Sequence, residues 1–284
     1  VASSQRSLFY EGKLILIDRD YVELNNLHRQ FFREEDIGKA KAEAMAKLLK
    51  EINSEVSVEA HFDNLDYTNA GKLLKADLIL DCTDNLETRF LINDFSLKKR
   101  VPFIYAAALA ESGYIFTIMP GETCFNCIFG KAITKETCET TGVLNIITSA
   151  ISVLQANQAM KIILQKEVDK ELFYFNSAQN RIEKIKVSKN PECEACNGIF
   201  KYLSGEKGSK IVKFCGSQNY LIRGKFNYVD LKEKLAKVSK ANGIKDFGNA
   251  FLFKDLTIFA DGRALIRAES EKEALSLFSR YVGN

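Results

Sequence analysis

The sequence lacks an apolar run long enough to span a bilayer, because its longest apolar stretch, residues 141–164, is interrupted by Asn, Ser and Gln. It has no charged segment followed by an apolar core at its beginning, no internal repeat and no low-complexity tract. Its net charge of +3 gives no reason to expect a nucleic-acid partner. We therefore expect a cytoplasmic globular protein that binds neither membranes nor nucleic acids.

Strand-like and helix-like segments alternate in the first part of the chain. Continuous apolar runs end in acidic residues at 13–18 and 76–84, and an alternating apolar pattern covers residues 55–62. Apolar residues at helical spacing mark residues 34–53 and 85–100. This order predicts an α/β fold with a doubly wound, mostly parallel sheet of the Rossmann-like type, with helices on both faces.

The composition changes near residue 200. A Gly-, Ser- and Lys-rich segment is followed by a helix, a hairpin and a last helix, and residues 201–284 contain 16 Lys or Arg against 9 Asp or Glu. We expect two domains, a large one at residues 1–200 and a small, basic α+β domain at residues 201–284.

Four of the seven cysteines form two CxxC pairs. This arrangement is typical of a tetrahedral zinc site, in which each pair occupies two corners. A redox dithiol and two disulfides are the alternatives, but redox CxxC motifs do not come in twos and the cytoplasm disfavours disulfides. The sequence therefore predicts a structural zinc site in the second half of the large domain, with the ligands Cys124, Cys127, Cys193 and Cys196.

Two other cysteines have less specific surroundings. Cys138 stands just before a predicted helix, where the helix dipole stabilises a thiolate, and an inert loop cysteine is the alternative. Cys82 lies inside an apolar run, and we expect it to be a core residue.

Charged residues follow the predicted strands. Asp18 ends the first strand, where carboxylates accept hydrogen bonds from a ribose, and Asp84 ends a later strand, where a carboxylate can hold Mg²⁺. Arg29 and Lys41 lie between them in the chain and are suited to polyphosphate. Each of these residues taken alone is more often a solvated surface charge.

Several longer segments occur together in unbroken order over residues 13–198. They are LILIDRDYVELNNLHRQFFREEDIGKAKAEA, LILDCTDNLETRFLIN, CFNC, TCETTGVLN with LQANQAMKIIL, and CEAC. Together they resemble the ThiF/MoeB/HesA family, the adenylylating enzymes of the ubiquitin-activating superfamily that act on ubiquitin-like sulfur carriers.

The resemblance implies a reaction and a set of site residues. Family members use ATP and Mg²⁺ to adenylylate the C-terminal Gly-Gly carboxylate of a small carrier protein, releasing pyrophosphate, and they form homodimers. By motif match, the nucleotide-binding residues would be Asp18 at the ribose, Asn26, Arg29 and Lys41 at the phosphates, Asp84 at the metal, and Gln30 and Asn85 lining the pocket. The catalytic residues would be Arg29, Lys41, Asp84 and Cys138, the last matching a loop cysteine that in some members carries a covalent linkage. The two CxxC pairs match the family's zinc ligands.

The chain departs from the family pattern in two places. The Gly-rich phosphate loop expected just before the first strand is not in the sequence, although Arg6 resembles an arginine that family members lend across the dimer. The basic C-terminal domain resembles a small tail found on shorter members, and its charge could steer an acidic carrier protein.

Two other functions are consistent with parts of the pattern. An NAD-dependent oxidoreductase would explain Asp18, but it would give Arg29, Lys41 and the four thiolates no role. A zinc-stapled binding scaffold that has lost ATP would explain the missing loop.

Overall fold

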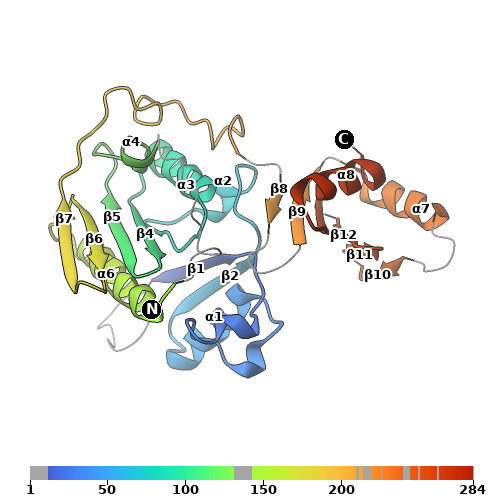
Figure 1. Ribbon diagram of the computed structural model, residues 1–284, viewed down its shortest axis with the longest axis horizontal. Coiled ribbons are helices and arrows are strands. Elements are labelled where there is room, and N and C mark those ends of the chain that lie inside the picture. The colour runs from blue at the N-terminus through green and yellow to red at the C-terminus, as the bar shows by residue number, and fades with distance from the viewer. Residues whose placement is uncertain are drawn as a thin grey trace. The chain divides into compact units, whose positions relative to one another are not determined.

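The computed structural model describes residues 12–130, 143–208, 211–213, 219–224, 226–238, 244–248, 250–260 and 262–283. The chain forms two compact units, which we call the N-terminal unit, ending at Gly208, and the C-terminal unit, beginning at Ser209. Figure 1 shows the elements of both units along the chain.

The N-terminal unit begins with a strand, a helix and a second strand. Strand β1 (Lys13–Asp18) pairs in parallel with β2 (Ser57–Phe62), and helix α1 (Lys41–Ile52) connects them. Alanines alternate along the first turns of α1 and are buried against this pair, which lets the helix lie close to the strands. The loop between β1 and α1 contains two short 3₁₀ helices, η1 (Leu24–Asn26) and η2 (Glu34–Asp36).

A five-stranded sheet forms the centre of the N-terminal unit, in the order β3-β4-β5-β6-β7. Its strands are β3 (Ile79–Leu80), β4 (Phe103–Leu109), β5 (Ser112–Ile118), β6 (Leu172–Asn176) and β7 (Arg181–Ile185). Only β3 and β4 pair in parallel, and the other three pairings are antiparallel. The expectation of a mostly parallel sheet is thus wrong for this part of the fold. Short turns join β4 to β5 and β6 to β7, and a short turn permits only antiparallel pairing.

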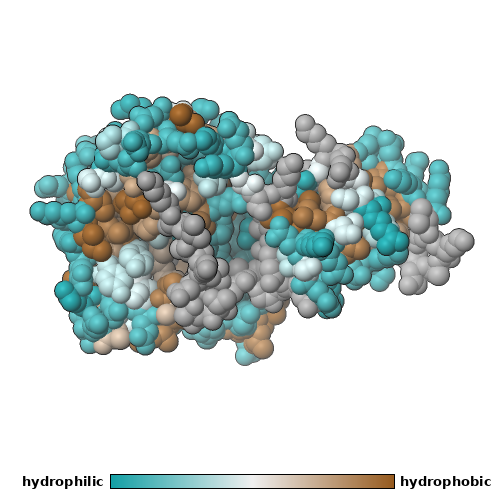
Figure 2. Space-filling view, turned by 45° about the horizontal axis from the view of Figure 1, so that its top comes forward, coloured by the Kyte–Doolittle hydropathy of each residue, from teal (hydrophilic) through white to brown (hydrophobic). Residues whose placement is uncertain are grey.

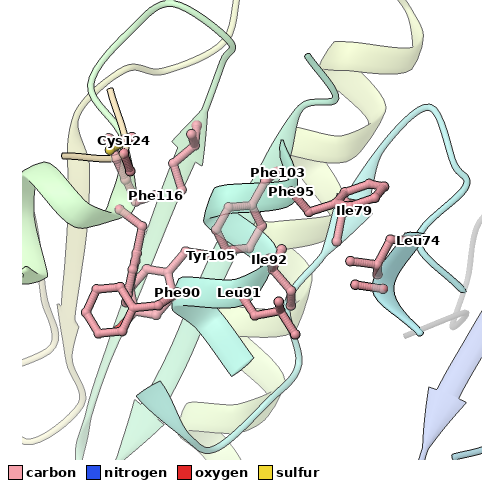
Figure 3. Close-up of a cluster of buried hydrophobic side chains, with 14 of the residues drawn as sticks. Leu74, Ile79, Phe90, Leu91, Ile92, Phe95, Phe103, Tyr105, Phe116 and Cys124 are labelled. Carbon is pink, nitrogen blue, oxygen red and sulfur yellow. The ribbon is translucent and has the colours of Figure 1, made fainter. Parts of the chain in front are cut away.

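Helices cover both faces of this sheet, as the sequence predicted. Helix α3 (Leu86–Lys99) packs on the face that carries Phe103 and Tyr105, and α6 (Asn145–Ile163) packs on the face that carries Ile104 and Ala106. Figure 1 shows the two helices on either side of β4 and β5, and Figure 3 shows side chains of α3 interleaved with those of the strands. None of the described helices is long and apolar enough to cross a bilayer.

Residues after position 200 continue the N-terminal unit. The backbone N–H of Tyr202 donates to Asp94 Oδ2 of α3 at 2.9 Å, and the Tyr202 ring stacks on Phe90 with a centroid separation of 4.9 Å. These contacts hold residues 201–208 against α3, so the unit reaches Gly208 rather than the expected boundary at residue 200. The described part of this unit also contains two short helices, α2 (Ala70–Leu73) and α4 (Phe125–Phe129).

The C-terminal unit is a six-stranded antiparallel sheet with two helices. The strand order is β10-β11-β12-β13-β9-β8. The strands are β8 (Ile211–Lys213), β9 (Asn219–Arg223), β10 (Lys245–Asp246), β11 (Ala250–Phe253), β12 (Leu256–Phe259) and β13 (Arg263–Arg267). The helices are α7 (Tyr228–Val238) and α8 (Glu271–Tyr281), and both contribute to one buried cluster with the strands. Ser270 caps α8 by accepting a hydrogen bond from the backbone N–H of Glu273.

Candidate functional site

The four cysteines of the CxxC pairs come together in the N-terminal unit. Their sulfur atoms lie within 4.8 Å of one another. The Sγ atom of Cys124 is 3.6 Å from that of Cys127, 3.6 Å from that of Cys193 and 3.4 Å from that of Cys196. A tetrahedral thiolate site with metal–sulfur bonds of about 2.3 Å has sulfur–sulfur edges of about 3.8 Å. These separations fit one shared metal ion and are far too long for disulfide bonds.

Burial of this cluster favours a bound cation. Cys124 and Cys193 are buried, and burial raises the pKa of Cys124 and raises that of Cys196 to about 12. The thiols of Cys124 and Cys196 therefore stay protonated unless a positive charge stabilises their thiolates. The backbone N–H of Asn190 donates to Cys127 Sγ at 3.4 Å, and a hydrogen bond of this kind stabilises a thiolate ligand.

The cysteine cluster brings together two segments that are distant in the sequence, next to α3. Cys124 precedes α4, whose first backbone N–H, that of Phe125, donates to Asn93 Oδ1 of α3 at 3.0 Å. Because Cys193 and Cys196 come from the end of the unit, a bound ion would join that end to α4 and the core under it. This arrangement suits a structural role.

The second group of candidate residues lies around the end of β1. Asp18, the last residue of β1, accepts a hydrogen bond from the backbone N–H of Asp20 at 2.9 Å. Burial raises the pKa of Asp18, against the effect of this hydrogen bond and of the nearby Lys41 charge. Asp18 is therefore a half-buried acceptor at the carboxyl end of a parallel strand, which is where ligands of such folds bind.

Lys41 is held beside Asp18 by an acid that the sequence analysis missed. Lys41 is the first residue of α1, and its Nζ atom lies 3.3 Å from Asp20 Oδ2, with only 13% of the Lys41 side chain exposed. The backbone N–H of Lys41 also donates to the Asp20 carbonyl at 2.9 Å. The only sequence signal for Asp20 is its place two residues after a strand-ending acid.

The predicted residues Asn26, Arg29 and Gln30 share the loop between β1 and α1. Asn26 is buried and folds this loop, because its Oδ1 accepts from the Glu23 backbone and its carbonyl accepts from the Gln30 backbone. The Arg29 guanidinium donates to the Asn25 carbonyl at 2.8 Å.

Two buried oxygen atoms of this loop have no hydrogen-bond partner among the described residues. They are Oδ1 of Asp20 and Oε1 of Gln30. Asp20 Oδ1 still has the Arg19 guanidinium 3.8 Å away. Buried acceptors are nearly always satisfied in native proteins, so Gln30 Oε1 indicates a missing donor, such as a ligand hydroxyl or metal-bound water.

Asp84 and Asn85 stand at the start of α3. Asp84 is exposed, and Asn85 caps the helix by accepting a hydrogen bond from the Thr88 backbone N–H at 2.8 Å. The cap fixes the point at which the chain leaves β3 and enters α3, and therefore the position of Asp84.

A buried network under this turn was not predicted. Asp81 has no exposed surface and pairs with Arg89, whose Nε lies 3.1 Å from Asp81 Oδ2. Gln155 of α6 donates to the carbonyls of Asp81, at 2.8 Å, and Ile104, at 3.0 Å. Burial raises the pKa of Asp81 against the opposing Arg89 charge. The network ties β3, β4, α3 and α6 together directly beneath the turn that carries Asp84.

Cys82 shows that the ends of β1 and β3 lie close to each other. Surrounding protein and the charges of Asp81 and Asp18 raise the pKa of the Cys82 thiol to about 11. Yet the side chain is accessible to solvent, so Cys82 is not the core residue that the sequence suggested. Two further predicted residues, Cys138 and Arg6, lie outside the described residues.

Comparison with known proteins agrees with this architecture. Residues 10–195 match the ThiF family. The "Sulfur carrier protein ThiS adenylyltransferase" of Bacillus subtilis is 31% identical over 288 residues, which cover 96% of this chain and 86% of that protein. The "SAMP-activating enzyme E1" of Haloferax volcanii is 32% identical over 192 residues, which cover 65% of this chain and 71% of that protein. The first relative is an adenylyltransferase, the enzyme class predicted from the sequence.

A solved structure shares this fold. The E. coli MccB structure with MccA-N7isoASN matches with a TM-score of 0.58 at 25% sequence identity. The match covers 65% of this chain and 60% of the MccB chain, so this chain corresponds to somewhat more than half of MccB. The family predicted from the motifs is thereby confirmed, and the chain belongs to the ThiF family.

Proposed function

We propose that this chain uses ATP to adenylylate the C-terminal Gly-Gly carboxylate of a ubiquitin-like sulfur-carrier protein. A carboxylate oxygen of the carrier forms a bond to the α-phosphorus, and the bond from that phosphorus to the bridging oxygen breaks. Pyrophosphate leaves with the electron pair, and no proton needs to move because the nucleophile is already ionised. The names of the relatives support this substrate class, since one acts on ThiS and another activates SAMP.

One observation carries the proposal. A half-buried lysine, Lys41, is fixed by Asp20 next to the acceptor Asp18, at the carboxyl end of β1. A preorganised cation beside a ribose acceptor is what an adenylyl transfer needs, because negative charge builds up on the phosphate oxygens in the transition state. Arg29 is assigned to the same phosphates.

The remaining assignments follow from this core. The nucleotide pocket would be lined by Asn26, Gln30 and Asn85. Gln30 Oε1, which has no hydrogen-bond partner among the described residues, would accept a hydrogen bond from the ligand. Mg²⁺ bound by Asp84 would neutralise phosphate charge. Zn²⁺ in the cysteine cluster would be structural. We further propose that the enzyme works in the cytoplasm as a homodimer, with Arg6 reaching the neighbouring site.

ATP–pyrophosphate exchange that depends on the carrier tests the proposal. The wild-type protein should exchange label only when carrier, ATP and Mg²⁺ are all present. Arg29→Ala and Lys41→Ala should each lose exchange by about two to three orders of magnitude, because each removes a cation that acts on the transition state. Cys138→Ala should keep exchange, since this cysteine would act only after adenylylation.

Lys47→Ala is the matched control for Lys41→Ala. Lys47 belongs to the same helix, but 61% of its side chain is exposed and it pairs with Glu51 on the surface. This control should exchange at the wild-type rate. Near wild-type exchange in Arg29→Ala would refute the assignment of that residue.

A further inference from the structure

A cavity of about 380 Å³ lies beside the cysteine cluster in the N-terminal unit. It is enclosed by α3, by α4 and by the segment that runs from Asn190 to Lys207. Figure 1 shows the chain after β7 passing over α4 and α3. None of the described residues that we assign to the nucleotide lines this cavity. The cavity is large enough for a small ligand or for one long side chain of a partner protein.

Asp94 places a buried carboxylate in the wall of this cavity, with only 3% of the residue exposed. Its Oδ2 atom accepts hydrogen bonds from the backbone N–H groups of Tyr202, at 2.9 Å, and Leu203, at 3.3 Å. Its Oδ1 atom accepts no hydrogen bond from the described residues. An ionised carboxylate can accept at both oxygens, so Oδ1 is available to a ligand in the cavity.

Two stacked aromatic rings stand next to this carboxylate. Phe90 lies one helical turn before Asp94 on α3, so the two side chains share a face of the helix. The Phe90 ring stacks on that of Tyr202 with a centroid separation of 4.9 Å and an interplanar angle of 17°, and both residues line the cavity. A carboxylate attracts a cation by its charge, and an aromatic ring attracts it by its quadrupole. This wall therefore has the chemistry that recognises ammonium and guanidinium groups.

The charges around the cavity also favour a cation. Three carboxylates and two ammonium groups line it: Asp94, Glu192, Glu194, Lys201 and Lys207. Both lysines are directed to Glu194, because Lys201 Nζ is bonded to its Oε1 atom and Lys207 Nζ lies 3.9 Å from its Oε2 atom. Among the described residues, neither lysine forms an ion pair with Asp94. A buried carboxylate without a paired charge is costly, and a bound cation would remove this cost.

We propose that this cavity binds a primary ammonium or guanidinium group, with the cation at Asp94 Oδ1 and its alkyl chain against Phe90 and Tyr202. A lysine or arginine side chain of a partner protein and a free amine both carry this chemistry. The inference concerns a site apart from Asp18 and Lys41 and does not depend on the proposed reaction.

Other classes of ligand fit the cavity less well. An anion would face the Asp94 carboxylate and would find both lysines engaged with Glu194. An apolar ligand would leave the lining carboxylates and amides without partners. Figure 2 shows mostly hydrophilic residues over this part of the N-terminal unit, so the surroundings of the cavity are polar as well.

Isothermal titration calorimetry of the full, zinc-loaded chain tests this site. Three cationic probes are used, namely N-acetyl-lysine amide, N-acetyl-arginine amide and putrescine, and N-acetyl-glutamine amide is the neutral control. The wild-type protein should bind at least one cation with a Kd of about 1 mM or tighter, and it should not bind the neutral probe. Binding of the amino-acid amides alone would identify a side chain of a partner protein as the ligand, and binding of putrescine alone would identify a free amine.

Asp94→Asn is the decisive variant. Its amide oxygen still accepts the backbone hydrogen bonds, but the charge is absent, so the affinity for the cation should fall by about tenfold or more. Tyr202→Leu keeps the same backbone bond and should weaken binding by about threefold, because it removes one ring. Glu55→Gln is the matched control, since it also removes one negative charge but lies outside the cavity, and it should bind like the wild type.

Circular dichroism should show that all three variants are folded. A wild-type protein that binds none of the three cations, or that binds the neutral probe equally well, would overturn the proposal. Unchanged affinity in Asp94→Asn, or an equal loss in Glu55→Gln, would overturn it as well.

Discussion

Arg89 illustrates how single residues support the candidate site without touching a ligand. It neutralises the fully buried Asp81 and also donates to the carbonyl of Thr83 in the turn before Asp84. The pair lies beneath this turn, so we regard Arg89 as a positioning residue.

Removal of Arg89 should strongly destabilise the N-terminal unit. Arg89→Met leaves the Asp81 carboxylate buried without its partner, which costs about 3–5 kcal/mol. The free energy of unfolding measured in urea should fall by this amount. The double variant Asp81→Leu, Arg89→Met removes both charges and should recover part of the loss. A double variant that is less stable than Arg89→Met would contradict this account of the pair.

Asp94 should make the stability of the N-terminal unit depend on pH. Burial raises the pKa of Asp94 to about 6, although the backbone N–H groups of Leu203 and Tyr202 oppose this shift. The pKa of Asp94 in the folded state lies above its ordinary value. Between about pH 4 and 6, the folded state therefore keeps a proton that the unfolded state has released. The stability contributed by this proton is fully present below about pH 4 and is lost as the pH rises through about 6.

Asp94→Asn should remove this dependence. Its amide oxygen still accepts the hydrogen bonds of residues 202 and 203, while the buried charge is absent. The stability of the variant relative to wild type should be higher at about pH 7.5 than at about pH 5, by on the order of 1 kcal/mol. Thermal or urea unfolding at both pH values measures the difference. An equal difference at the two values would show that Asp94 does not titrate in this range.

At the scale of elements, the sequence predicted most helices and strands but not how the strands pair. The helices α1 and α3 and the strands β1 and β2 lie within the segments where periodicity placed them. The alternating order of strands and helices suggested a mostly parallel sheet. Pairing direction depends on the connection between two strands, and here the hairpins outweigh the early strand–helix–strand pattern.

The cysteine cluster is an element-scale feature whose removal should be measurable. The holoprotein should contain one Zn²⁺ per chain. Removal of this ion with a chelator should lower the unfolding temperature, because the four converging cysteines then lose the cation that holds them together. Cys193→Ser should lose the metal in the same way. Cys82→Ser is the control, since Cys82 lies away from the cluster near Gln155, and it should keep full zinc content. Full zinc content in Cys193→Ser would contradict the assigned ligand set.

At the scale of the whole molecule, motif spacing predicted the family and the four converging cysteines. CxxC spacing is so specific that ligands 69 residues apart in the chain could be paired without a structure. The supporting contacts could not be predicted, because they join residues that are distant in sequence. Gln155 is the clearest case. It interrupts an apolar helix and looks like a surface residue, yet it is buried and bonded to the carbonyl of Asp81, 74 positions away.

The most direct test of the central claim is the mass of a Gly-Gly-ended carrier protein after incubation with this enzyme, ATP and Mg²⁺. Our account predicts that intact-mass spectrometry finds the carrier heavier by one adenylyl group, that pyrophosphate is released in step, and that Lys41→Ala yields almost none of this product. A carrier that stays unmodified with the zinc-loaded wild-type enzyme, or one that is modified equally well by Lys41→Ala, would contradict it.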